Sequence, residues 1–339
     1  MSDPVRAPRL VGGTFEVSGA VELAVAERSG FIETRHVGSA LVLSPDGERM
    51  IALGSPDAPI LPRSTLKPFQ AVASIGAGAR LDGEQTALAS ASHAGTAAHV
   101  AVVRRMLTEV GLDESALLCP PALPADSDAR NDVLGGGGRP SPIYMECSGK
   151  HAGMLSACVA NGWTTADYTD ARHPLQQHVK DVVERLTGEK VAHTAVDGCG
   201  APVFAITLAG LARGVQRVAT TSEQSPFALY RNAARVYRSA REHPWAISGS
   251  GRPDTVLMEL LHCYAKAGAD GVMTMATDDG TAVAVKVLDG NVRAARTAAV
   301  ALLAKAGAIT TDAAQSALEA ADTVVLGGGA PVGRLRPVV

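Results

Sequence analysis

The serine and lysine of Arg63-Ser64-Thr65-Leu66-Lys67 have a spacing that suits nucleophilic catalysis. Residues three apart lie on one face of a helix, with Cβ atoms about 5–6 Å apart, so the Lys67 amine can reach the Ser64 hydroxyl. Serine becomes an effective nucleophile when a base takes its proton, and Ser-x-x-Lys recurs in acyl-transfer enzymes. The same four residues also occur by chance in surface helices. The motif alone therefore marks a candidate nucleophile and its base.

The segments around this motif are expected to form an antiparallel sheet followed by helices. Residues 20–27 and 38–44 are rich in β-formers, and Pro45-Asp46-Gly47 predicts a turn that returns the chain along 50–54. Helical periodicity predicts that the helix carrying Ser64 runs to about Ile75. Its N-terminus would offer free N–H groups and a partial positive charge, which suit an oxyanion.

The rest of the chain alternates between helical and strand patterns. Helices are expected over 82–91, 96–110, 147–161, 174–187, 203–213, 225–241, 255–265, 293–306 and 311–321. Strands are expected at 191–196, 271–276, 282–288 and 322–326. Residues 119–142 are rich in proline and contain Gly135-Gly136-Gly137-Gly138, which predicts a long exposed loop. No Gly-Lys-Ser/Thr follows these glycines, so they do not indicate phosphate binding.

Composition narrows the class of protein. The chain has 339 residues, 46% hydrophobic and 19% charged, enough for one large domain or two closely packed lobes. A net charge of −3 argues against a nucleic-acid surface, and no apolar run of 18 residues or more indicates a membrane span. The five cysteines are scattered, and Met1–Leu10 lacks the apolar core of a signal peptide. Both features indicate free thiols in a reducing cytoplasm.

Four clusters together resemble a known family, the Rhizobium etli type of L-asparaginase, also called the asparaginase II family. The clusters are Pro62-Arg63-Ser64-Thr65-Leu66-Lys67-Pro68-Phe69-Gln70-Ala71, Ala91-Ser92-His93, Cys147-Ser148-Gly149-Lys150-His151-Ala152-Gly153-Met154 and Asp197-Gly198-Cys199-Gly200-Ala201-Pro202. Shorter matches are Arg35-His36, Gly249-Ser250-Gly251-Arg252, Lys266-Ala267-Gly268-Ala269-Asp270-Gly271, Val285-Lys286-Val287-Leu288-Asp289-Gly290 and Val332-Gly333-Arg334-Leu335-Arg336. The resemblance covers nearly the whole chain. In one departure, Thr96 follows Gly95 where the family commonly has Glu, which bears on substrate specificity.

The resemblance implies an α/β fold similar to serine β-lactamases and glutaminases: an antiparallel sheet flanked by helices, with a mostly helical lobe. It implies a single catalytic domain over residues 1–339, with two lobes and the site between them. It also implies hydrolysis of L-asparagine to L-aspartate and ammonia by two Ser–Lys pairs, Ser64/Lys67 and Ser92/Lys266. The family's zinc ligands fall on Cys147, Lys150 and Cys199, and two thiolates suit zinc. We expect a cytoplasmic homodimer that binds neither nucleic acid nor membrane and uses no organic cofactor.

Two facing Ser–Lys pairs would make chemical sense. A lysine that acts as a base near neutral pH needs a pKa roughly three units below its ordinary value of about 10.4, and burial beside a second cation lowers it. One pair would then activate the nucleophile while the other relays a proton to the departing ammonia. The substrate's α-carboxylate calls for an arginine and its α-ammonium for a carboxylate, for which Arg63 and Asp197 are the candidates.

Each of these residues also has a structural interpretation. Lys266 could be a cation at a helix C-terminus, Ser92 a helix cap, Arg63 part of a surface ion pair and Asp197 a turn cap. We interpret Cys119, Cys158 and Cys263 as buried core residues. His93 and His151 suit either a role in supporting the site residues or a purely structural one. Two other functions stay open: a glutaminase or other amidase or esterase on the same scaffold, and a non-catalytic, zinc-stabilised ligand-binding protein.

Overall fold

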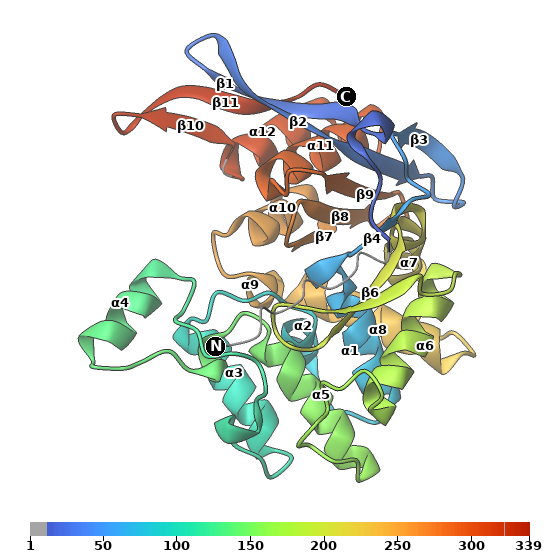
Figure 1. Cartoon of the computed structure of the whole chain (residues 1–339), viewed down its shortest axis with the longest axis vertical. Coiled ribbons are helices and arrows are strands. Elements are labelled where there is room, and N and C mark those ends of the chain that lie inside the picture. The colour runs from blue at the N-terminus through green and yellow to red at the C-terminus, as the bar shows by residue number, and fades with distance from the viewer. Residues whose placement is uncertain (1–11, 322) are drawn as a thin grey trace, which may run out of the picture.

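The computed structural model describes residues 12–321 and 323–339, and an antiparallel sheet of eight strands forms one end of this part of the chain (Figure 1). The strand order is β10-β11-β1-β2-β9-β8-β7, and β3 pairs with β2. The strands are β1 Val21–Arg28, β2 Phe31–Leu43, β3 Arg49–Leu53, β7 Cys263–Gly268, β8 Val272–Thr277, β9 Ala282–Val287, β10 Val324–Gly327 and β11 Ala330–Pro337. The expectation about a signal peptide in Met1–Leu10 lies outside the described residues.

Helices cover both faces of the sheet at its central strands. All residues of β9 are buried, and successive side chains of a strand point to opposite faces, so neither face of β9 meets solvent. The helices α7 (Leu208–Thr220) and α11 (Val292–Lys305) both pack against β9, and α12 (Thr311–Ala320) packs against α11. These packed layers hold β7, at the edge of the sheet, in a fixed position.

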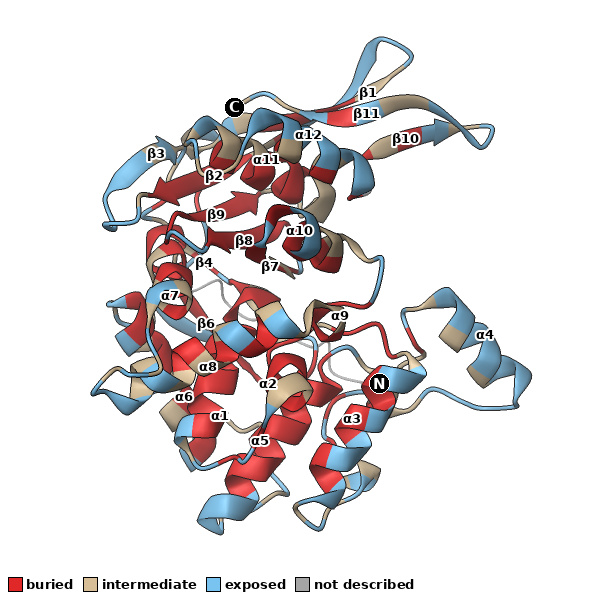
Figure 2. Cartoon of the chain, turned by 180° about the vertical axis from the view of Figure 1, so that it is seen from behind, coloured by how far each residue is buried: buried red, intermediate tan, exposed pale blue. Residues whose placement is uncertain are grey.

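The other end of the molecule is mostly helical (Figure 1). Its helices are α1 Lys67–Gly76, α2 Gly83–Ala89, α3 Ala97–Thr108, α4 Ser127–Gly135, α5 Ser148–Asn161, α6 Pro174–Thr187, α8 Ala228–Glu242 and α9 Pro244–Ile247. Helix α10 (Pro253–Leu261) lies at the sheet end (Figure 1), where it packs against β7 and α12. A small sheet of order β4-β6-β5 lies beside them, formed by β4 Pro59–Ile60, β5 His193–Val196 and β6 Pro202–Thr207. Helix α1 packs against α5, α6 and α8, and Figure 2 shows it buried among them.

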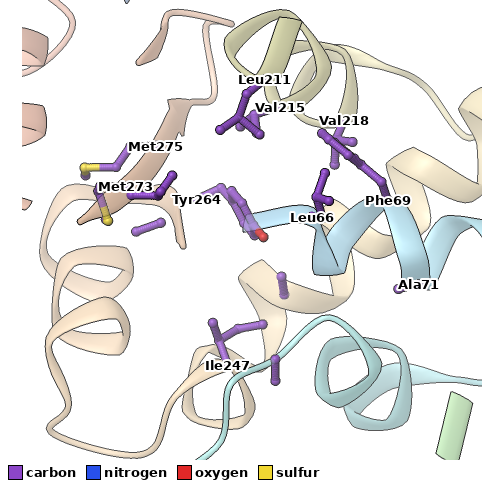
Figure 3. Close-up of a cluster of buried hydrophobic side chains, with 14 of the residues drawn as sticks. Leu66, Phe69, Ala71, Leu211, Val215, Val218, Ile247, Tyr264, Met273 and Met275 are labelled. Carbon is purple, nitrogen blue, oxygen red and sulfur yellow. The ribbon is translucent and has the colours of Figure 1, made fainter. Parts of the chain in front are cut away.

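A buried apolar cluster joins the start of α1 to the large sheet. Figure 3 shows Leu66 and Phe69 near side chains of α7, with Tyr264 of β7 and Met273 and Met275 of β8 in the same cluster. Burying side chains of this size stabilises the folded state by about 1.5–3 kcal/mol each. The segment that bears Ser64 and Lys67 is therefore packed against β7, which bears Lys266, and against β8.

Most elements agree with the patterns of the sequence. The hairpin of β2 and β3 turns at Gly47, whose φ of 84° favours glycine, and α6 has the predicted bounds. The fold class is confirmed: an α/β protein with an antiparallel sheet flanked by helices and a mostly helical lobe. The prediction of one catalytic domain over residues 1–339 stays a prediction. No helix in the described ranges is both long and apolar enough to cross a membrane.

Three predicted elements are wrong. Residues 203–213 are not one helix, because β6 occupies Pro202–Thr207 and α7 begins at Leu208. The predicted helix 255–265 ends at Leu261, after which β7 begins at Cys263. Residues 203–213 and the residues of β7 are nearly all buried, so their apolar pattern fits a strand as well as a helix. The loop predicted over 119–142 contains α4, which Asp126 caps by accepting a hydrogen bond from the Ala129 N–H.

Candidate active site

Ser64 lies in a 3₁₀ turn, Arg63–Leu66, directly before α1. The residue before it, Arg63, has a φ of 54°, a left-handed conformation that costs free energy for a residue with a side chain and is often found at functional sites. Edge strand β7 approaches this turn closely. A Cβ atom on Gly268 would lie 2.7 Å from the Pro62 carbonyl oxygen and 3.3 Å from the Ser64 nitrogen, so only glycine fits there.

Both predicted lysines converge on the second serine. Lys67 Nζ donates a hydrogen bond to Ser92 Oγ at 2.8 Å, and Lys266 Nζ donates to the same oxygen at 2.9 Å. Lys266 also donates to the carbonyl oxygen of Ala267. The pair Ser92/Lys266 is therefore in contact, as the resemblance implies. No hydrogen bond joins the Ser64 hydroxyl to Lys67 in the described part of the chain, so Lys67 is hydrogen-bonded to Ser92 rather than to Ser64.

The two amines lie in the protein interior, where an ammonium is costly. Lys67 is 1% exposed and Lys266 is fully buried. Burial, together with the nearby Lys67 cation, lowers the pKa of Lys266 to about 8, although Asp254 and Glu146 act in the opposite direction. The unprotonated Lys266 amine, which can accept a proton, is therefore more populated near neutral pH than that of an exposed lysine.

A cavity of about 300 Å³ lies beside Ser92 and Lys266. Its lining includes Ser64, Ser92 and Lys266, together with Gly268 from the end of β7. Residues from the helical lobe and from the large sheet thus face one space. This volume suits a small substrate such as a single amino acid.

Arg63 and Asp197 do not line this cavity. They form an ion pair with each other, in which Arg63 Nε donates to Asp197 Oδ1 at 2.7 Å, and Arg63 is also paired with Asp270. Arg63 instead lines a separate cavity of about 460 Å³ with Asp270 and Lys286. The charges of both predicted substrate-binding residues are therefore balanced within the protein.

The three residues of the expected zinc site come together. Cys147 precedes α5, Lys150 lies in its first turn, and Cys199 lies in the turn between β5 and β6. Lys150 Nζ donates to Cys199 Sγ at 2.9 Å, and the thiol of Cys147 is hydrogen-bonded to Cys199. All three side chains are buried.

This cluster is electrically polarised. The hydrogen bond from Cys147 lowers the pKa of Cys199 strongly, against the effect of burial, and Lys150 and His151 add to the lowering. The pKa of Cys147 is raised by the same hydrogen bond and by burial. Burial depresses the pKa of Lys150, but the two sulfur atoms outweigh it and the net pKa is raised. The cluster thus contains a thiolate, a thiol and an ammonium, a set that becomes two thiolates and a neutral amine when the thiol and the ammonium give up their protons.

The described residues contain no group of three or more His, Cys, Asp or Glu side chains placed to hold a metal ion. The candidate set has two such residues, and its third donor is a lysine. Soft sulfur donors in a buried, preformed cluster nevertheless suit zinc. The three residues fit the ion in donor type and proximity.

The histidines flank these sites. His93 Nδ1 accepts from the Gly95 N–H, so Nε2 carries the ring proton and donates to Ser148 Oγ at 2.9 Å. His151 Nδ1 and the Tyr168 hydroxyl are 2.7 Å apart. All five cysteines are free, and burial raises the pKa of Cys119 and Cys263 to about 12 and that of Cys158 to about 11. These three are inert core thiols, in agreement with the sequence interpretation.

Four charged residues of the cavity are not among the predicted site residues: Glu146, Arg252, Asp254 and Arg296. Asp254 and Arg296 form a buried ion pair of 3.1 Å, and Asp254 also accepts from the Ala267 N–H at 2.8 Å. This ties the start of α10 to the strand that carries Lys266. Glu146 and Arg252 stand inside or next to matched motifs, which is the one signal that could have drawn attention to them.

Comparison with known proteins supports the resemblance at the level of family. No curated protein sequence matches the chain. Among solved structures, a β-lactamase from Mycobacterium bovis is similar with 15% identity and a TM-score of 0.44, over 79% of this chain and 94% of that one. A protein titled Mglu in its native form has 12% identity and a TM-score of 0.45, over 80% of this chain and 64% of its own. The family model L-asparaginase II matches residues 24–337, and the chain therefore belongs to the L-asparaginase II family.

Proposed function

We propose that this protein is an amidohydrolase that converts L-asparagine to L-aspartate and ammonia. One observation carries the proposal: two buried lysines meet at Ser92 Oγ beside a cavity that also exposes Ser64, in a chain of the L-asparaginase II family. Amide hydrolysis needs a nucleophile, a base, oxyanion donors and a proton for the leaving amine. The residues in this cavity supply candidates for each.

In the proposed reaction the Ser64 oxygen attacks the side-chain amide carbon and forms a bond to it. The serine proton passes to Lys67 as that lysine transfers a proton of its own through Ser92 Oγ to the unprotonated amine of Lys266. The oxyanion accepts hydrogen bonds from N–H groups at the start of the Ser64 turn. Collapse of this intermediate breaks the C–N bond. Ser92, held by Lys67 and Lys266, then donates a proton to the departing nitrogen and is reprotonated by Lys266, which returns to the unprotonated form. Water hydrolyses the resulting ester by the same relay in reverse.

A zinc ion would be held by Cys147, Lys150 and Cys199. When bound, it would fix the loop of Cys199 to the start of α5 and polarise groups next to it. Glu146 directly precedes Cys147, so the ion would also steady one wall of the cavity. The nucleophile and the proton relay come from the two Ser–Lys pairs, and the ion is assigned no step of the reaction.

The assignment of Arg63 and Asp197 to the charged ends of the substrate stays a prediction. Their mutual ion pair supports a positioning role, because it anchors the strained residue next to Ser64 to the turn that carries Cys199. The expected homodimer is also untested, and light scattering of the purified protein would test it.

Ammonia release from L-asparagine by purified protein tests the proposal, with L-glutamine and simple esters as competing substrates. Ser64→Ala is expected to remain folded and to lose all detectable turnover, because removing any member of a catalytic unit removes its effect. The control is Ser74→Ala, on the helix α1 that follows Ser64, where the Ser74 hydroxyl donates to the Gln70 carbonyl away from the cavity. Activity of Ser64→Ala at control level would refute the nucleophile, and preference for another amide or an ester would redirect the proposed substrate.

A further inference from the structure

Five charged side chains line the cavity that holds Ser64 and Ser92, and they are Glu146, Arg252, Asp254, Lys266 and Arg296. Asp254 and Arg296 are paired with each other, and Lys266 is hydrogen-bonded to Ser92 and Ala267. Neither Glu146 nor Arg252 has a side-chain hydrogen bond or an ion pair within residues 12–321 and 323–339. The cavity thus retains one negative and one positive side chain whose hydrogen-bonding atoms are not engaged by another side chain or the backbone of the described residues.

These two residues belong to fixed parts of the structure. The backbone carbonyl of Glu146 accepts from the His93 N–H at 3.2 Å, next to Ser92, and Glu146 is close enough to Lys266 to raise its pKa. Arg252 is the residue before α10, and its N–H donates to the Gly249 carbonyl in a tight turn.

The side chain of Arg252 lies against Gly249. A Cβ atom on Gly249 would be 3.0 Å from Arg252 Cδ, and the φ of Gly249 is 127°. Two residues later, Asp254 binds the backbone of β7 beside Lys266. The Arg252 side chain is therefore presented to the cavity from a braced turn.

A free α-amino acid carries a carboxylate and an ammonium on one carbon atom. Its binding needs a cation and an anion that reach the same small space, and a guanidinium and a carboxylate are the groups that recognise these charges. We propose that Arg252 binds the α-carboxylate and Glu146 the α-ammonium of the substrate, so that these two residues restrict the site to free amino acids. This inference rests on the proposed function and assigns the substrate's charged ends to residues other than Arg63 and Asp197.

Three amide substrates distinguish the contact of Arg252 with the carboxylate from that of Glu146 with the ammonium. L-Asparagine has both charges, succinamate lacks the ammonium, and 3-aminopropanamide lacks the carboxylate. Arg252→Met is expected to lower kcat/KM for asparagine and succinamate about 10- to 100-fold, the effect of one charge-assisted hydrogen bond, and to leave 3-aminopropanamide unchanged. Glu146→Gln is expected to affect asparagine and 3-aminopropanamide and to spare succinamate. The losses should lie in KM, and Arg252→Lys should restore part of the carboxylate effect.

Matched controls are Arg139→Met and Glu259→Gln, which change exposed residues that do not line the cavity. Equal losses on all three amides, or none, would overturn this inference while leaving the proposed function intact. A carboxylate-selective loss in Arg63→Met, with Arg252→Met unchanged, would overturn it in favour of Arg63. A wild-type protein that hydrolyses none of the three amides would overturn the proposed function, and this inference with it.

Discussion

Lys266 is the residue whose chemistry should be most visible in solution. Its pKa is lowered to about 8 by burial and by Lys67, so the amine is mostly protonated below that pH and free to accept a proton above it. The rate of asparagine hydrolysis should therefore rise as the pH is raised through about 8 and then level off. In Lys266→Met this rise should be absent and kcat should fall by at least about 100-fold.

The control for this pH profile is Lys190→Met, since Lys190 forms a surface ion pair with Glu184. It should keep both the rate and the rise. If Lys266→Met kept the same rise in rate with pH, a group other than Lys266 would control that rise.

The same burial should cost stability. Because the folded-state pKa of Lys266 lies below its unfolded value of 10.5, the unfolded chain binds more protons between pH 8 and 10.5, and stability should increase across that window. The shift corresponds to about 3 kcal/mol, as an order of magnitude. Urea unfolding at pH 7 should find Lys266→Met more stable than wild type, with the advantage shrinking by pH 10. Lower stability of the variant at pH 7 would contradict this account.

At the level of residues, the sequence indicates the candidate reactive groups better than their contacts. Ser64 and Lys67 are visible as a motif because a helical turn fixes their spacing. The contact from Lys67 to Ser92 joins residues 25 positions apart, and that from Lys266 to Ser92 joins residues 174 apart. Such contacts depend on how the loop after α2 and the strand β7 pack, which local pattern does not determine.

The fit between β7 and the Ser64 turn is the critical contact between elements. Gly268→Ala would place a methyl group 2.7 Å from the Pro62 carbonyl oxygen, so strand or turn must move by several tenths of an ångström. Because misplacement of reacting groups on this scale is costly, kcat should fall at least about tenfold while the protein remains folded.

The control for Gly268→Ala is Gly135→Ala at the end of α4, where an added Cβ would meet no atom within 4 Å. It should leave both kcat and the unfolding temperature unchanged. Full activity of Gly268→Ala would show that the turn tolerates the displacement and that its close approach to β7 is not needed for catalysis.

Elements are predictable where one face is polar. Helix α6 has a clear apolar face and a solvated one, and its bounds are as predicted. Strand β7 is buried at almost every position and follows α10 after a single residue, His262, in the left-handed conformation. Without alternation, the lysine of β7 looks like a cation at a helix end. The predicted secondary structure around Lys266 was therefore wrong, although Lys266 does lie at the candidate site.

In the whole molecule, the cavity is lined both by the helical lobe and by the large sheet. Ser64, Ser92 and Glu146 come from the helical side, while Lys266 and Arg296 belong to β7 and α11. The ion pair of Asp254 with Arg296 joins α10 to α11 on the sheet side of the cavity. The geometry of the site therefore depends on how the two parts are held together.

The cluster of Cys147, Lys150 and Cys199 should act on this scale, because it joins α5 to the turn between β5 and β6. If it holds zinc, purified protein should contain about one zinc per chain, and Cys147→Ser or Cys199→Ser should lose the metal. Each should also lower the unfolding temperature, since a bound metal stabilises only the folded state. The control is Cys263→Ser, a buried thiol in β7 with no part in the cluster, which should keep its zinc.

Removal of the metal should leave some asparaginase activity, with weaker substrate binding, because the Ser–Lys pairs stay in place. Elemental analysis showing no zinc in protein prepared without chelator would refute the metal site. Complete loss of turnover in the metal-free protein would instead place the ion in the chemical step.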